Sequence, residues 1–262
     1  MDMRSATPPP SGELVAVSWN LHKGRSPLGL QAWSAMRQWV HANAADIFFL
    51  QEAMSRRMPA PLVAAAFGEP LLSPVEDLWH CQATEIASSL QMQLALGQNV
   101  FKPTWRHGNA ILSPHQLDLS GQWDISAHRF ERRGLLVARM TYGGRMVTLL
   151  CAHLALTRSA RVRQMEWIAH WIERDAPEGP LVLAGDFNDW KNDSLGIFGS
   201  IGLVEVADSL GDQARTFPSF SAALGLDKIF VRGLTPVGWS VPDRKLAWLS
   251  DHLPYIARLR FN

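Results

Sequence analysis

The string GDFND, Gly185 to Asp189, places two carboxylates and an amide directly after the apolar run PLVLA. A buried strand ending in this cluster would point Asp186 and Asn188 out of the carboxyl edge of a sheet, where open α/β sheets usually bind their ligands. Side chains of this kind at such an edge suit hydrolytic chemistry. A surface turn is the other interpretation, because Asp and Asn are the commonest turn residues.

Polar residues recur at the ends of other apolar runs. They are Asn20 after ELVAVSW, Glu52 after DIFFLQ, Asn109 in RHGNAILS, His153 after VTLLCA, Asp227 before KIFV, and Asp251 and His252 in SDHLP. Taken singly, each has an ordinary explanation, such as a turn, a helix N-terminal acid, a core histidine or a salt-bridge partner. Their recurrence in one chain favours a common site at the strand ends.

In this order the motifs resemble the endonuclease/exonuclease/phosphatase superfamily, the metal-dependent phosphoesterases that include DNase I, abasic-site endonucleases, neutral sphingomyelinases and inositol polyphosphate 5-phosphatases. The resemblance runs from SWN at residue 18 to SDH at residue 252. HGNAILS, ERRGLL, AHLAL and GDFNDW together are most similar to bacterial members whose substrates are poorly defined. The resemblance implies an α/β (α+β) fold, a four-layered sandwich of two central sheets with helices outside. It also implies hydrolysis of phosphate esters with a divalent metal.

The residue types agree with that chemistry. Carboxylate and amide oxygens without a cysteine partner suit a hard ion such as Mg²⁺ or Mn²⁺. We expect Glu52 to be its principal ligand, with Asn20 and Asp251 completing the shell directly or through water. By resemblance, Asp186 accepts the proton of the attacking water and Asn188 orients the nucleophile or a phosphate oxygen.

The resemblance assigns the remaining site residues to the phosphate. His252 stabilises the pentacovalent phosphate, with its other nitrogen held by Asp227, and His153 and Asn109 face the same group. Abasic-site endonucleases carry a tyrosine where this chain has His153, and a lysine soon after QE where it has Met54. Both departures weigh against an abasic-site activity.

Arginines supply a further expectation about phosphate binding. Arg132 or Arg133 in ERRGLL could grip a phosphate oxygen bidentately. The alternative is a solvated pair on an edge strand.

Composition fits one domain of this kind. A chain of 262 residues with 47% hydrophobic content can bury a large core, and we expect a single domain over residues 13–262. The Pro-rich opening, residues 1–12, reads as a disordered tail and not as a signal peptide. No apolar stretch approaches the ~18 residues of a membrane span, and only Cys81 and Cys151 are present. A monomeric cytoplasmic enzyme is the simplest expectation.

Periodicity predicts strands near residues 13–19, 46–50, 109–113, 134–141, 145–152, 181–185, 227–231 and 255–260, and helices near 28–43 and 158–175. Gly143 and Gly144 predict a tight hairpin turn in YGGR. The stretch 53–106 is expected to be variable, with a possible amphipathic helix from Thr84 to Leu96, and to form a wall of the cleft.

Substrate identity is the least constrained property. The net charge of +1 does not indicate avid non-specific nucleic-acid binding, although arginines crowd residues 129–163. Trp105, Trp190 and Trp248 lie near motif residues, where they could stack on bases, lipids or sugars. We expect a phosphodiesterase or nuclease acting on DNA or RNA. The alternatives are a phospholipid or small-molecule phosphodiesterase or phosphatase, and a catalytically silent binding protein on the same fold.

Overall fold

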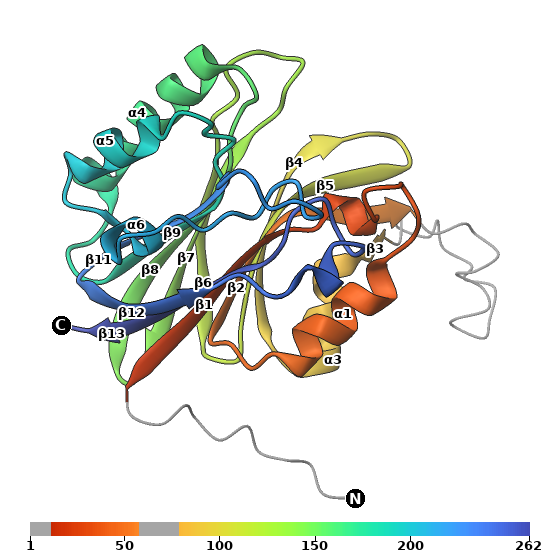
Figure 1. Ribbon diagram of the computed structural model, residues 1–262, viewed down its shortest axis with the longest axis horizontal. Coiled ribbons are helices and arrows are strands. Elements are labelled where there is room, and N and C mark those ends of the chain that lie inside the picture. Colours follow the sequence, from red (N-terminus) through yellow and green to blue (C-terminus); the bar gives the residue numbers. More distant parts are fainter. Residues whose placement is uncertain (1–11, 58–78) are drawn as a thin grey trace, which may run out of the picture.

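The computed structural model describes residues 12–57 and 79–262 (Figure 1). The expected tail over residues 1–12 lies outside this part of the chain except for its last residue, and so does the segment 58–78 of the expected variable stretch.

Two mixed β-sheets form the centre of the fold. The first has seven strands in the order β12-β13-β1-β2-β5-β4, with β3 paired to β2, and only β1 and β2 are parallel among its pairs. Its strands are β1 (Glu13–Asn20), β2 (Ile47–Arg57), β3 (Trp79–Cys81), β4 (Gln93–Phe101), β5 (Trp105–Ser113), β12 (Leu234–Ser240) and β13 (Tyr255–Phe261).

The second sheet has six strands in the order β10-β11-β9-β8-β7-β6, and here β8 and β9 are the parallel pair. Its strands are β6 (Leu117–Asp124), β7 (Gly134–Tyr142), β8 (Arg145–His153), β9 (Leu181–Asp186), β10 (Val204–Glu205) and β11 (Asp227–Arg232). Gly143 and Gly144, both at positive φ, form the predicted hairpin turn between β7 and β8.

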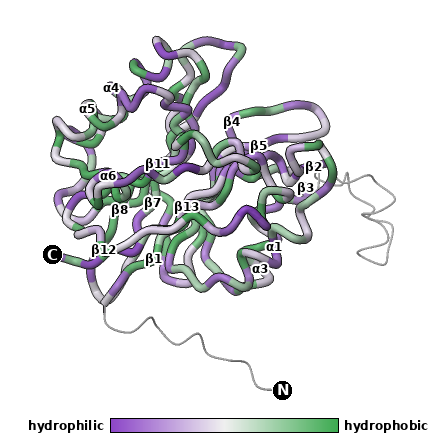
Figure 2. The backbone as a smooth tube through the Cα atoms, in the orientation of Figure 1, coloured by the Kyte–Doolittle hydropathy of each residue, from purple (hydrophilic) through white to green (hydrophobic). Residues whose placement is uncertain are grey.

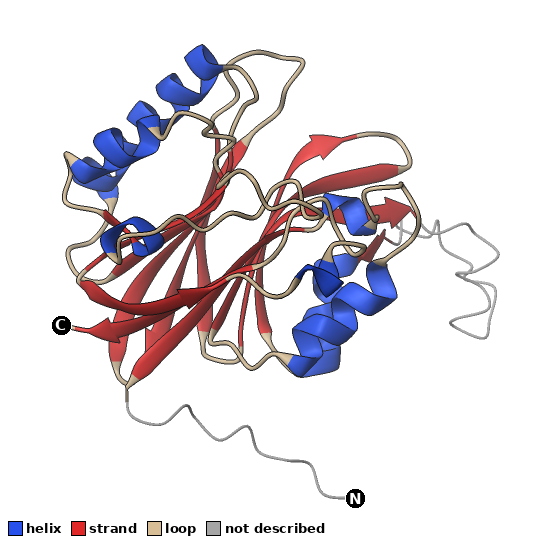
Figure 3. Cartoon of the chain, in the orientation of Figure 1, coloured by secondary structure: helices blue, strands red, loops and turns tan. Residues whose placement is uncertain are grey.

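Helices cover the outer faces of both sheets, which confirms the predicted four-layered sandwich (Figures 1 and 3). The helical elements are α1 (Trp33–Ala42), α3 (Gln82–Leu90), α4 (Arg158–Asp175), α5 (Asp193–Gly199), α6 (Val206–Ser209) and the 3₁₀ turns η1 (His22–Gly24) and η2 (Arg244–Leu246). Among the described residues, no helix is long and apolar enough to cross a membrane.

Three layers of apolar side chains hold the sandwich together. One lies between the sheets, a second joins the first sheet to α1 and α3, and the third joins the second sheet to α4 and α5. The helices carry both hydrophobic and hydrophilic residues, as expected for helices with one face on a sheet (Figure 2). Cys81 and Cys151 are both buried as free thiols.

Several predicted boundaries are wrong. The first helix begins at Trp33 and not near residue 28, because residues 25–31 form a loop closed by a bridge between Arg25 and Gln31. The possible helix Thr84–Leu96 is α3 followed by β4, since Gln91 adopts the left-handed conformation that ends α3. The described parts of the variable stretch 53–106 are therefore largely regular structure.

The second predicted strand is also longer than expected. We placed Glu52 just past its end, but β2 continues to Arg57, and Glu52 lies inside it at a bulge against β5. Glu52 has a φ of 55°, an uncommon conformation for a residue other than glycine, and such bulges often re-aim a side chain.

The topology brings the polar strand ends together. In the second sheet, the last residues of β8 and β9, His153 and Asp186, are register partners, and Asp227 at the start of β11 is opposite Asp186. In the first sheet, Asn20 ends β1 and pairs with Gln51. One edge of the sandwich therefore gathers these side chains from both sheets.

Gly185 makes this close approach possible. Its φ is 153°, and a Cβ added there would lie 1.8 Å from the carbonyl oxygen of Ala152. We expect Gly185→Ala to lower the free energy of unfolding by about 1–3 kcal/mol or more, because backbone must move to admit the methyl group. Chemical denaturation measures this change. The matched control is Gly196→Ala in α5, where no atom lies within 4 Å of the added Cβ. Equal stability of the two variants would contradict the requirement for glycine at position 185.

Candidate active site

Asp186 is the centre of the candidate site. Its carboxylate is 2% exposed, and each of its oxygens has partners. Oδ2 accepts a hydrogen bond from Asn20 Nδ2 at 3.0 Å, and Oδ1 accepts one from the backbone N–H of Asn188 at 3.0 Å. Two imidazoles face the same Oδ2 atom, with Nε2 of His153 at 3.4 Å and Nε2 of His252 at 3.7 Å.

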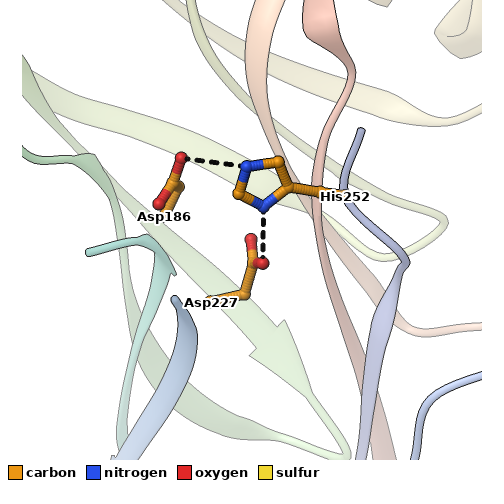
Figure 4. Close-up of side chains that lie close together, drawn as sticks. All are labelled: Asp186, Asp227 and His252. Carbon is orange, nitrogen blue, oxygen red and sulfur yellow. Dashed lines mark hydrogen bonds and ion pairs between the residues drawn. The ribbon is translucent and has the colours of Figure 1, made fainter. Parts of the chain in front are cut away.

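His252 is braced by a second carboxylate on its other side (Figure 4). Its Nδ1 lies 2.8 Å from Asp227 Oδ2, which also accepts a hydrogen bond from the hydroxyl of Thr216. The indole N–H of Trp19 donates to the backbone carbonyl of His252 at 2.9 Å. These contacts fix the position and the orientation of the imidazole ring.

The electrostatic environment gives the two histidines different charges. Burial alone would lower the pKa of His252, but the carboxylates of Asp227 and Asp186 outweigh it and raise the pKa to about 10. Burial, reinforced by the positive charge of Arg133, holds the pKa of His153 well below its usual value. At neutral pH, His252 is therefore a cation and His153 a neutral imidazole.

Burial also raises the pKa of Asp186, although the charge on His252 opposes this. An ionised carboxylate with a raised pKa accepts a proton more readily than an exposed aspartate does. Asp186 is thus a proton acceptor, and His252, whose Nε2 lies 3.7 Å from Asp186 Oδ2, is a charged hydrogen-bond donor beside it.

Two predicted amides already donate hydrogen bonds from their side-chain nitrogens. Asn188 adopts the left-handed conformation and donates from Nδ2 to the carbonyl of Leu154 at 3.0 Å. Asn109 donates from Nδ2 to two carbonyls of the second sheet, Gly134 at 2.9 Å and Cys151 at 3.1 Å. Asn109 therefore has only its side-chain oxygen left for a ligand, whereas Asn188 keeps that oxygen and a second N–H.

The three predicted metal ligands belong to neighbouring segments at this edge. Asn20 and Gln51 are register partners, which places Glu52 one residue beyond Asn20's partner. Ser250 Oγ donates to the backbone carbonyl of Asn20 at 2.7 Å and so holds the segment that carries Asp251. Glu52 lines a cavity of about 910 Å³.

The donor set around Glu52 fits a hard cation. Its carboxylate already contacts a positive charge, the ammonium of Lys23, at 2.8 Å. Burial would raise the pKa of Glu52, but Lys23 outweighs burial and the pKa lies below its usual value. Asp251 Oδ1 lies 3.7 Å from Nδ1 of His22. The side-chain oxygen of Asn20 accepts a hydrogen bond from the backbone N–H of His22 at 3.0 Å and keeps a second lone pair for a ligand. Carboxylate and amide oxygens of this kind suit Mg²⁺ or Mn²⁺.

A second group of possible ligands occurs among the described residues. One atom each of Asp186, Asp227 and His252 lies within 4.8 Å of the others, and all three residues are buried. The Asp227 oxygen that faces His252 is already engaged by that ring and by Thr216. This engagement favours a brace over a metal site.

The two predicted arginines differ in exposure. Arg132 is half-exposed and pairs with Asp124 at 3.0 Å. Arg133 is only 11% exposed and pairs with Glu131 at 2.9 Å, and its buried Nε has no hydrogen-bond partner among the described residues. Both line the same cavity as Glu52.

Sequence reasoning left two further residues of this cavity unassigned. Lys23 follows Asn20 in NLHKG, and His107 precedes Asn109 in RHGNAILS, so both stood in motifs already singled out. Burial lowers the pKa of His107 to about 4, which keeps it neutral beside Glu52. A lysine or histidine near a motif has no signature of its own, and only the fold places these two beside the carboxylate.

Comparison with known proteins identifies the family of this chain. A model of the Endonuclease/Exonuclease/phosphatase family matches residues 17–252. The chain is 32% identical over 249 residues to the Escherichia coli K12 protein YbhP, covering 92% of this chain and 93% of the relative.

Two solved structures illustrate the shared fold. One is D. rerio TDP2 in complex with a single-strand DNA product, with TM-score 0.65, 16% identity, and 95% and 99% of the two chains covered. The other is a mannosyl-6-phosphatase of Bacteroides thetaiotaomicron, with TM-score 0.67, 18% identity, and 95% and 100% covered.

Metal binding is testable at Glu52. Glu52→Gln removes the charge and keeps the shape, and we expect Mn²⁺ affinity measured by calorimetry to fall at least ~10-fold. The matched control is Glu131→Gln, which removes a carboxylate from the same cavity and should leave the affinity unchanged. Unchanged affinity in Glu52→Gln, or equal losses in both variants, would remove Glu52 from the ligand set.

Proposed function

The chain belongs to the endonuclease/exonuclease/phosphatase family, and we propose that residues 13–262 form one domain that is a divalent-metal-dependent phosphodiesterase. Phosphodiesters resist attack because their oxygens repel nucleophiles, so catalysis requires charge neutralisation and an activated water in line with the leaving oxygen. The observation that carries the proposal is the buried Asp186 carboxylate, with Asn20 bonded to it and His153 and His252 facing the same oxygen.

Each residue has a role in this proposal. Asp186 accepts the proton of the attacking water, and the charged Nε2–H of His252 donates to a non-bridging oxygen of the phosphate. Asp227 holds His252 in place and preserves its charge. The oxygen of Asn188 orients the nucleophile, while the neutral His153 and the oxygen of Asn109 face the phosphate.

The metal ion would be held by Glu52, Asn20 and Asp251. When bound, it neutralises charge on the phosphoryl oxygens and lowers the pKa of a coordinated water. Lys23 contacts the Glu52 carboxylate at 2.8 Å, so its ammonium would add positive charge beside the bound phosphate.

Nucleic acid is the leading substrate class. The cavity beside Glu52 is lined by Lys23, Lys102 and three arginines together with aromatic side chains, a composition suited to a charged backbone with flat bases. The D. rerio TDP2 structure, which shares the fold, contains a single-strand DNA product. We propose DNA or RNA strands as the substrate on these grounds.

A phospholipid is the second candidate substrate, and one feature favours it. A separate cavity of about 480 Å³ is lined by Pro27, Leu28, Phe220, Arg244, Ala247 and Trp248. Leu28, Phe220 and Trp248 are 70%, 66% and 67% exposed. Exposed apolar side chains on neighbouring loops suit a lipid surface.

A panel assay tests the proposal. Plasmid DNA, RNA, bis-p-nitrophenyl phosphate, phospholipid vesicles and inositol phosphates are incubated with the protein and Mg²⁺ or Mn²⁺. We expect metal-dependent hydrolysis of bis-p-nitrophenyl phosphate and of a nucleic acid. No hydrolysis in any arm with either ion would contradict the proposed function and favour a catalytically silent binding protein.

The roles of Asp186 and His252 predict that replacing either residue lowers turnover. Asp186→Asn or His252→Ala should lower turnover of bis-p-nitrophenyl phosphate by ~10²-fold or more, the range of general acid–base and electrostatic catalysis. Asp227→Asn should be milder, because it acts through His252. Steady-state kinetics give the rates, and thermal melts confirm folding. Near wild-type turnover in a folded Asp186→Asn or His252→Ala variant would refute the mechanism.

Phosphate binding by the arginines predicts a change in salt dependence. With a DNA oligonucleotide, Arg132→Ala plus Arg133→Ala should reduce the slope of log affinity against log salt by about 0.7–0.9 for each lost phosphate contact. Fluorescence anisotropy at several salt concentrations measures the slope. The control pair, Arg139→Ala plus Arg174→Ala, removes the same charge beside a different cavity and should not change it. A slope near zero in the wild type would contradict a nucleic-acid substrate.

A further inference from the structure

The cavity beside Glu52 is a groove built from both sheets. One wall is formed by the ends of β4 and β5, with Phe101 and Trp105, and the other by the end of β6 and residues 129–133. Two hydrogen bonds tie the walls together. Asn99 Nδ2 donates to the carbonyl of Arg132 at 2.8 Å, and Gln122 Nε2 donates to the carbonyl of Gln98 at 2.7 Å.

Aromatic rings face this groove from both walls. The ring of Trp105 stacks on that of His107, with centroids 5.6 Å apart and planes 12° from parallel. On the opposite wall Phe130 is 83% exposed, with the guanidinium of Arg129 4.7 Å from its ring centroid. A phenylalanine this exposed buries little in the described chain and leaves ring surface beyond the Arg129 contact for a ligand.

Positively charged side chains also line the groove. Within the described part of the chain, Lys23, Arg132 and Arg133 are paired with carboxylates, whereas Lys102 and Arg129 line the groove without an ion pair. Amides of Gln98, Asn99 and Gln122 stand among them. Stacking faces, amides and two spare cations suit a base, a sugar and a phosphate, whereas an acyl chain requires a continuous apolar surface.

We propose that this groove is a nucleoside-binding subsite, in which Phe130 stacks on the base attached to the scissile phosphodiester and Lys102 and Arg129 hold a neighbouring phosphate. The volume of about 910 Å³ is in the range of ordinary ligand sites and accommodates a nucleotide. The inference rests on the proposed phosphodiesterase function, because it takes the scissile phosphate to lie at Glu52.

The test compares three esters with the same leaving group. Thymidine p-nitrophenyl phosphates, as 5′ and 3′ esters, carry a base, whereas methyl p-nitrophenyl phosphate carries none. We expect the wild type with Mn²⁺ to prefer one thymidine ester over the methyl ester in kcat/KM by about 5-fold to 100-fold, the range for stacking one base. Phe130→Ala and Phe130→Leu should bring this preference close to 1, whereas Phe130→Tyr should retain it.

The matched control is Trp167→Ala, which removes another exposed aromatic side chain from α4, outside the groove. It should leave the preference unchanged. If none of the three esters is hydrolysed, the proposed function fails. Hydrolysis of the thymidine and methyl esters with equal kcat/KM in the wild type, or a preference that survives Phe130→Ala, would overturn the subsite and leave the phosphodiesterase intact. Loss of the preference in Phe220→Ala or Trp248→Ala instead would place the base in the apolar cavity and equally overturn it.

Inhibition identifies the source of the nucleoside. A dT10 oligonucleotide and thymidine 5′-monophosphate are compared as competitors of the thymidine ester. Stronger inhibition by dT10 supports the subsite with a polynucleotide as its ligand, and equal inhibition supports it with a free nucleotide. No inhibition by either compound would contradict it.

Discussion

A carboxylate removed from water must be solvated by protein groups, and Asp186 imposes this requirement at the junction of the two sheets. Moving an ion into a protein interior without partners costs several kcal/mol. The first sheet supplies Asn20 and the segment that carries His252, and the second supplies His153 and the turn at Asn188. The polar contacts that solvate Asp186 therefore also fix how the sheets meet at this edge.

Asp227 is a second buried carboxylate that protein groups must solvate. This residue is fully buried, and its partners are the imidazole of His252 and the hydroxyl of Thr216. Two carboxylates around one imidazole keep that ring charged, and the ring in turn reduces the cost of burying both carboxylates. Replacing any member leaves an unpaired buried group, which is why stability and chemistry are coupled at this edge.

Much of this arrangement was predictable from the sequence. Asn20, His153 and Asp186 follow apolar runs and Asp227 precedes one, and the family that the motifs resemble implied the sandwich. The position of Glu52 was not predictable, because the run DIFFLQEA does not reveal that β2 continues through a bulge. A sequence also does not show that Lys23 contacts Glu52 or that Asn109 donates its N–H groups to backbone carbonyls. Both contacts depend on how the two sheets pack.

The proposed mechanism depends on which of two possible positions binds the cation, Glu52 or the group of Asp186, Asp227 and His252. We place the ion at Glu52, assign proton transfer to Asp186, and assign charge stabilisation to His252, which Asp227 braces. A crystal of the protein soaked in Mn²⁺ and measured at a wavelength where manganese scatters anomalously locates the ion directly. We expect an anomalous peak about 2.1 Å from a carboxylate oxygen of Glu52, close to the metal–oxygen distance in octahedral coordination. A peak among Asp186, Asp227 and His252, with none at Glu52, would contradict the proposed mechanism.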